Sequence, residues 1–280
     1  MRVWLIIGVV HVMAMGSTAS AQAEPLASPA LEAAVTQTCL DWMKPLDTNA
    51  QLSLKRVDGG LCLNGHIETG DDKPVLDQLN SFGKTEPLVM VVRSGGGEVK
   101  AALAIGEALL DHPATVVADT FCASSCANFL ITAGHRRVVR PDTLLLYHGG
   151  ATLEQLEQAL PQLRAFAAQD PQIMFNTYED TLTTINRQEA FLTKAGISST
   201  LFRWMDLINY MAPAEAGSHC PLDSVVVEYP PVVLARFGLT FDAYETPRSQ
   251  TELDDLRHRL GKKSPPACGA TRPFRRSRRS

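Results

Sequence analysis

The sequence predicts an α/β fold in which helices flank a mainly parallel sheet. The first observation is a continuous apolar run, residues 87–94, which ends at three glycines and is followed by an amphipathic segment at 98–112. The second is a repeat of this order, with a strand-like run at 114–119 and a buried helical pattern at 126–134. Strand, loop and helix therefore alternate twice, which favours parallel strands joined by right-handed crossovers.

The elements on either side of this region follow from periodicity and turn residues. In chain order, we expect a strand at 61–70, a short helix at 74–82, strands at 136–139 and 142–148, a helical region at 152–194, a helical turn at 211–219 and a strand at 223–229. No internal repeat is found, so the pattern indicates one sizeable domain.

The first residues have the order of a secretory signal peptide. Arg2 gives a positive start, residues 3–15 are mostly apolar, and small residues follow up to Ala23. The apolar run is too short to span a bilayer comfortably, so we expect cleavage after Ala23 rather than a membrane anchor. The mature chain is then expected in the periplasm or outside the cell.

Composition divides the rest of the chain. A mixed leader, residues 24–49, precedes the predicted domain at 50–260. Residues 261–280 begin as a linker rich in Pro and Gly and end in a strongly basic stretch. We expect a disordered tail there that could contact an anionic membrane surface. The formal net charge of −4 says little about partners, and no nucleic acid is expected.

The six cysteines of an exported chain favour disulfides over metal binding. No Cys-x-x-Cys pair and no His at ligand spacing supports zinc, so no metal is expected. Cys122 and Cys126 bracket two serines and could bridge each other only across a loop-to-helix corner. We therefore expect both to have partners elsewhere, with Cys39 and Cys62 as the other pair that joins.

Three loops at the carboxyl ends of predicted strands carry residues suited to chemistry. The loop Gly95–Gly97 could aim backbone N–H groups at an anion, or it could be a tight turn. Ser124 and Ser125 begin a helix, where developing negative charge is favoured, but a serine there is also a common helix cap. His148 ends a strand, where a neutral imidazole could accept a serine proton or be purely structural.

Together these loops resemble a known family. The stretches VVRSGGGEVKAALAIGEAL, CASSCANFLITAG and RRVVRPDTLLLYHGG are similar to the proteolytic subunit of the Clp protease and its exported relatives. The resemblance covers about Leu61 to Gly150 and implies a crotonase-like ββα spiral with parallel sheets and flanking helices. It also implies that Ser124 is the nucleophile and His148 the base. The substrate backbone and the oxyanion would bind at the glycine loop, through Gly95, Gly96 and the adjoining Gly97.

The chain departs from the family pattern in three places. The pattern Ala-Ser-x-small-Ala that starts at Ala123 favours Ser124 as nucleophile, and the Ser125 amide would then bind the oxyanion. Counting back from Ala133-Gly134 favours Ser125 instead. Cys126 stands where the family usually has Gly. Asp206 is the candidate third member of the triad, but its spacing along the chain from the turn that follows differs from the family pattern by one or two residues. An Asn or a water could orient His148 instead.

The sequence thus predicts an exported serine hydrolase, a peptidase for short or unfolded peptides that needs no cofactor. The alternative is a binding protein on the same scaffold that captures peptides without turnover. Acyl-CoA chemistry, as in crotonases, is disfavoured because CoA is not expected outside the cytoplasm. Family subunits form rings through the long helix after the His, so a homo-oligomer is a further expectation. Residues 153–166 are a candidate for that helix, although Pro161 would interrupt it.

Overall fold

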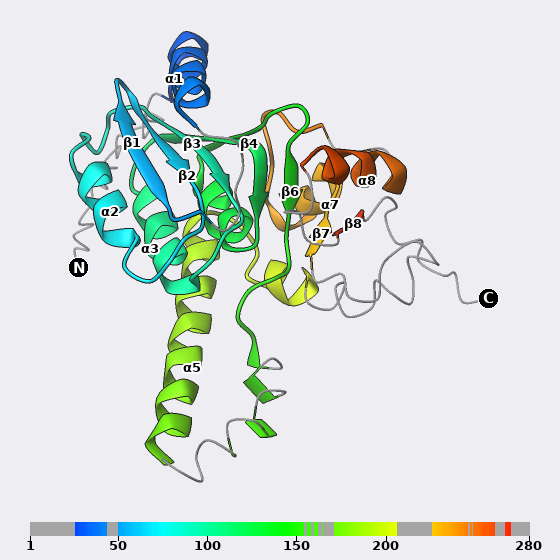
Figure 1. Ribbon diagram of the computed structural model, residues 1–280. Helices are drawn as coiled ribbons and strands as arrows, with labels where there is room; N and C mark the ends of the chain where they lie inside the picture. The colour runs from blue at the N-terminus through cyan, green and yellow to red at the C-terminus, as the bar shows by residue number, and fades with distance from the viewer. Residues whose placement is uncertain are drawn as a thin grey trace, which may run out of the picture.

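The computed structural model describes residues 26–43, 50–153, 156–157, 160–161, 164, 171–205, 226–245, 247, 249–260 and 267–269. A six-stranded sheet forms its centre (Figure 1). In chain order the strands are β1 (Ser53–Val57), β2 (Gly60–Asn64), β3 (Leu88–Ser94), β4 (Ala114–Ala123), β5 (Arg136–Val139) and β6 (Leu144–Leu146). Every pairing except the β1–β2 hairpin is parallel, so the predicted α/β fold is confirmed.

The long strand β4 determines where the site can lie. One of its edges pairs with β3, and the other pairs first with β5 and then, after an irregularity, with β6. The ends of β4 and β6 are therefore neighbours, because Ala123 is paired with Leu146. Whatever follows these two strands in the sequence is brought together at one place.

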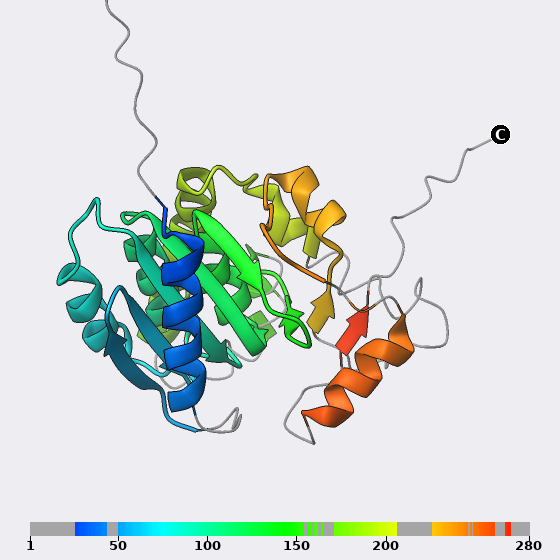
Figure 2. The ribbon, with the colours of Figure 1, turned by 90° about the horizontal axis from the view of Figure 1, so that it is seen from above.

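Helices cover both faces of the sheet. The main core lies between the sheet and α2 (Asp72–Asn80), α3 (Val99–Leu109) and the π-helix η1 (Cys126–Ile131). On the opposite face, α1 (Pro29–Trp42) lies across the strands, and α8 (Gln250–Arg259) packs on β6 and the end of β4 (Figure 2). The elements that remain are β7 (Val226–Glu228), α7 (Pro231–Leu234), the short 3-10 helix η2 (Ala235–Phe237) and β8 (Ala267–Gly269).

Six of the described elements were not predicted, namely α1, β1, α7, η2, α8 and β8. For α1 and the β1–β2 hairpin the sequence carries a clear local signal. Ser28 caps α1 by accepting a hydrogen bond from the Leu31 amide at 3.2 Å, and Pro29 occupies the first turn, where proline is favoured. Asp58 and Gly59 form the two-residue turn between β1 and β2, with Gly59 at φ 70°. Asp-Gly is a common hairpin turn because it tolerates positive φ.

The helix α5 (Pro171–Lys194) projects away from the body of the molecule (Figure 1). Three ion pairs anchor α5 to α3 and to the residues just after α3. They join Lys100 with Asp180 at 2.9 Å, Glu107 with Arg187 at 2.6 Å, and Asp111 with Lys194. Phe191 and Leu192, near its carboxyl end, are buried in the main core. The amino-terminal half lacks this cover and exposes apolar side chains, namely Ile173, Met174, Phe175 and Tyr178.

Several sequence predictions lie outside the described residues. These are the signal peptide, the helical turn at 211–219, the expected tail at 261–280 apart from 267–269, and much of the segment 153–166. The expectation of disorder is wrong for 267–269, because these residues form β8 and pair in parallel with β7. Within the described ranges, no helix has the length and apolar character needed to cross a membrane.

Candidate active site

The pairing of β4 with β6 brings Ser124 and His148 into contact. Ser124 directly follows β4, and His148 comes two residues after the end of β6. The Ser124 amide donates to the Leu146 carbonyl at 2.9 Å, which extends the strand pairing by one step. The Ser124 Oγ then lies 2.6 Å from His148 Nε2, which is hydrogen-bond distance. This is the contact that a serine nucleophile and its general base require.

Ser124 adopts a backbone conformation that is unusual for a residue with a side chain. Its φ is 56°, in the left-handed region, which costs about 1–2 kcal/mol for a residue other than Gly. The chain turns sharply here between β4 and η1. Such strained strand-to-helix turns hold a nucleophilic serine out of the helix in other hydrolase folds. The Ser124 carbonyl accepts a hydrogen bond from the Asn128 amide at 2.8 Å, which holds the turn to η1.

The glycine loop packs directly against this turn. Gly96 has φ 85°, and a Cβ there would lie 2.6 Å from the Ala123 carbonyl oxygen and 2.7 Å from the Ser125 nitrogen. Only glycine permits this approach, because a real Cβ does not come so close to backbone atoms. Ser125 Oγ donates to the Gly97 carbonyl at 2.9 Å. The two serines therefore point to different places: Ser124 meets His148, and Ser125 is bound to the glycine loop.

The helix after the serines explains why two ways of counting gave different serines. Residues Cys126–Ile131 form a π-helix, whose turns hold more residues than α-helical turns do. One extra residue between the serines and Ala133-Gly134 is accommodated in this way. Counting forward from the strand end leads to Ser124, which is the serine that contacts His148. The sequence predicted a helix here but not its type.

Of the two predictions about cysteine pairing, the structure confirms one and contradicts the other. Cys39 and Cys62 form a disulfide between α1 and β2, as predicted. The expectation that Cys122 and Cys126 have partners elsewhere is wrong, because they are bonded to each other. The sharp turn at Ser124 brings their Cα atoms to 5.3 Å, which is within the usual range for a disulfide. Without this sharp turn, the four-residue separation of Cys122 and Cys126 in the sequence does not predict that they bond to each other.

The surroundings of His148 favour its neutral form. Burial lowers the pKa of His148 below its ordinary value of 6.5, and a backbone hydrogen bond opposes this shift. A neutral imidazole can accept the proton of Ser124. Asp206, the residue expected to orient His148, lies outside the described residues.

Asn128 is a residue of the site that the sequence analysis missed. It is buried on η1, and its Nδ2 donates to the carbonyl of Gly149, the residue next to His148. The backbone N–H of Asn128 also donates to the Ser124 carbonyl. Asn128 therefore connects the backbone of the serine turn with the backbone of the histidine loop. An Asn in an otherwise apolar helical pattern was the available signal, because a buried amide needs hydrogen-bond partners.

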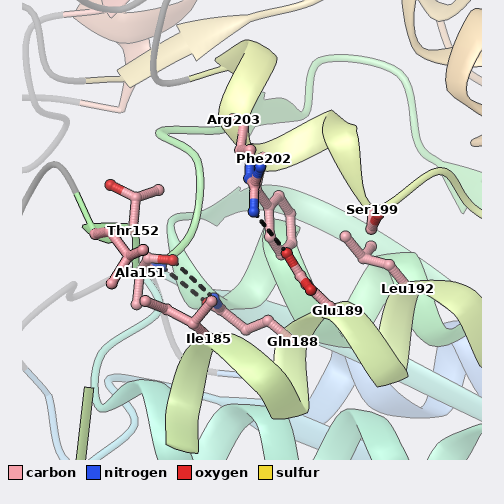
Figure 3. A pocket seen from close by; sticks show the side chains of 10 residues that line it. Ala151, Thr152, Ile185, Gln188, Glu189, Leu192, Ser199, Phe202 and Arg203 are labelled. Carbon is pink, nitrogen blue, oxygen red and sulfur yellow. Dashed lines mark hydrogen bonds and ion pairs between the residues drawn. The ribbon is translucent and has the colours of Figure 1, made fainter. Parts of the chain in front are cut away.

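A cavity of about 100 Å³ lies beside residues 151–153, the segment that follows His148 (Figure 3). Gln188 of α5 holds the backbone of Ala151 with two hydrogen bonds, of 3.0 and 3.1 Å. Glu189 and Arg203 form an ion pair at 3.0 Å on the same side. In the part of the chain that the structure describes, no cluster of His, Cys, Asp or Glu could hold a metal ion.

The comparison with protein families agrees with this arrangement. The family model described as Clp protease matches residues 50–190, which is half of the chain. The chain belongs to the Clp protease family. No curated protein matches it.

Membership of the Clp protease family confirms the resemblance drawn from the three sequence stretches. It is also consistent with the mainly parallel sheet and flanking helices of the structure. The match contains the glycine loop, Ser124 and His148, and it ends within α5, before Asp206. Membership supports a peptidase-like function, and members of the family act on peptides and often form oligomers.

Proposed function

We propose that the chain is an exported serine peptidase in which Ser124 is the nucleophile and His148 is the general base. The observation that carries this proposal is the 2.6 Å contact between Ser124 Oγ and His148 Nε2, made by a serine in a left-handed turn. The adjacent glycine loop and the amino-terminal end of η1 support it, because both can supply backbone N–H groups to an oxyanion.

The reaction follows from the positions of these groups. His148 Nε2 takes the proton of Ser124 Oγ as the oxygen attacks the carbonyl carbon of a peptide. The negative charge that develops on the carbonyl oxygen is stabilised by the Ser125 amide and by amides of the loop Gly95–Gly97. The protonated His148 then donates to the leaving amine, and a water molecule releases the acyl group by the same steps in reverse. We propose Asp206 as the residue that orients His148.

The substrate class is proposed from the expected location. An exported chain would not meet an ATP-driven unfolding partner of the cytoplasm, so its substrates are short or already unfolded peptides. The cavity beside residues 151–153 is near His148 along the chain and could receive a substrate side chain. Contact of the basic tail with an anionic membrane surface would place the enzyme near the membrane.

Labelling with a serine-directed fluorophosphonate tests the proposal. The wild-type chain should carry the label on Ser124, Ser124→Ala should lose it, and Ser125→Ala should keep most of the labelling rate because its amide remains. The rate should rise with pH through a midpoint below 6.5, because the pKa of His148 is lowered and only the neutral imidazole accepts a proton. Labelling of Ser125 would reassign the nucleophile. A chain that binds peptide but is never labelled would be a binding protein.

A further inference from the structure

The disulfide between Cys122 and Cys126 encloses the proposed nucleophile. Cys122 is the next-to-last residue of β4, and Cys126 is the first residue of η1. The bond therefore closes a short covalent ring whose other members are Ala123, Ser124 and Ser125. Both cysteines are fully buried and belong to the main core, so the ring is anchored on the inner side of the turn.

Apart from the disulfide and the packing of Gly96 against it, the turn is held by single hydrogen bonds. The Ser124 amide donates to Leu146, its carbonyl accepts from Asn128, and Ser125 Oγ donates to Gly97. Each of these bonds can be exchanged for a bond to water when the turn opens. The left-handed φ of Ser124 is disfavoured for a serine, so an unconstrained turn would gain by relaxing to another conformation.

Relaxation of this one residue would separate the reacting groups. A change of φ at Ser124 swings the Oγ away from His148 Nε2, while β4, β6 and the histidine loop stay in place through their own pairings. The disulfide limits this change because it fixes the distance between the residues two before and two after Ser124. We propose that the Cys122–Cys126 disulfide is a positioning element that holds Ser124 within reach of His148. This proposal rests on the proposed function of the same site.

A consequence is that the Ser124 reaction depends on the redox state of these cysteines. A dithiol such as dithiothreitol would supply two electrons and two protons, each cysteine sulfur would become a thiol, and the reagent would close to its own disulfide. Two thiols pack well in an apolar core, so the fold is expected to survive while the turn relaxes. Oxidation by the reverse exchange would restore the turn.

The second disulfide provides a matched control. Cys39 and Cys62 are also fully buried, but they join α1 to β2 on the opposite face of the sheet from η1. Two double variants are compared, Cys122→Ala with Cys126→Ala and Cys39→Ala with Cys62→Ala. The fluorophosphonate labelling rate at Ser124 is measured at a temperature where circular dichroism shows each variant to be folded. We expect the first variant to label about 10- to 100-fold more slowly, since small misplacements at a reacting centre have effects of this size. The control should keep the wild-type rate.

A readout that does not need activity completes the test. Amide hydrogen exchange at Ser124 and Asn128, and the NMR titration of the His148 ring, report the turn and its contact with the histidine directly. In the first variant, exchange should be faster and the titration shifted, with neither change in the control. Equal labelling and unchanged exchange in all three proteins would overturn the positioning role. A wild-type chain that is never labelled would refute the proposed hydrolase, and the exchange and titration data would still decide the role of the disulfide.

Discussion

At the scale of single residues, the site depends on how closely backbones can approach. Gly96 lies against the turn that carries Ser124, and its missing side chain is what allows the contact. Ser125 contributes to this packing by donating to Gly97. The neighbouring serines thus have separate roles, one toward His148 and one toward the glycine loop, although both belong to the same turn.

This contact makes Gly96→Ala a sharp test. The added Cβ would lie 2.6 to 2.9 Å from Ala123, Ser125 and Ser124, so the turn would have to move. We expect a loss of about 1–3 kcal/mol in the free energy of unfolding and at least a 10-fold fall in labelling rate. Denaturant unfolding and fluorophosphonate kinetics measure the two effects.

Gly70→Ala is the control for backbone strain alone. Gly70 also has a left-handed φ, of 94°, but a Cβ there would have nothing within 4 Å. It should cost about 1 kcal/mol of stability and leave the labelling rate unchanged. If both variants label alike, the packing of Gly96 on the nucleophile turn has no functional role.

At the scale of elements, α5 has two unlike halves. Its carboxyl-terminal half is fixed to α3 by ion pairs and to the core by Phe191, whereas its amino-terminal half carries exposed apolar side chains. Clustered exposed apolar residues mark interaction surfaces in soluble proteins. Because members of the Clp protease family often form oligomers, this half of α5 is the proposed contact between copies of the chain.

Substitution on this surface tests self-association. Phe175, 55% exposed, is replaced by Glu, and the neighbouring exposed Asn176 is replaced by Glu as a charge-matched control. Phe175→Glu should shift the mass measured by light scattering after gel filtration toward the monomer, because it puts a charge into an apolar contact. Asn176→Glu should change it less. A wild-type chain that is already monomeric would rule out this surface as an oligomer contact.

At the scale of the whole molecule, a buried carboxyl links stability to pH. Glu228 of β7 is 3% exposed, and the Tyr244 hydroxyl donates to its Oε1 at 3.0 Å. Its Oε2 has no hydrogen-bond partner among the residues that the structure describes. Burial raises the pKa of Glu228 to about 8, against an ordinary value of 4.5. The folded state therefore holds this proton more tightly than the unfolded chain does.

The sign of the pH effect follows from this raised pKa. The stability associated with protonated Glu228 is fully present below pH 4.5 and is lost as the pH rises through about 8. Glu228→Gln keeps an acceptor for Tyr244 and removes the titration. It should stabilise the protein by about 1–3 kcal/mol at pH 8.5 and change it little at pH 4.5. Urea unfolding at the two pH values measures this, with the exposed Glu245→Gln as control. An equal effect at both pH values would contradict the assignment.

Much of the fold and part of the site could be predicted because their signals are local. The apolar run of β3, the amphipathic α3 and the glycines between them are readable from adjacent residues. Ser124 and His148 could be proposed because each directly follows a recognisable strand. The hairpin turn and the cap of α1 have signals of the same kind, and these were overlooked.

The sequence by itself determined the α/β order, the three loops and the family of this protein. Tertiary structure alone decided which serine faces His148, that Cys122 bonds to Cys126, and that Asn128 joins the two loops. Periodicity records which side of an element is buried, but it does not record strand register or the type of a helical turn. Those arise when β4 pairs with β6 and η1 winds as a π-helix, and they are set by contacts between residues far apart in the chain.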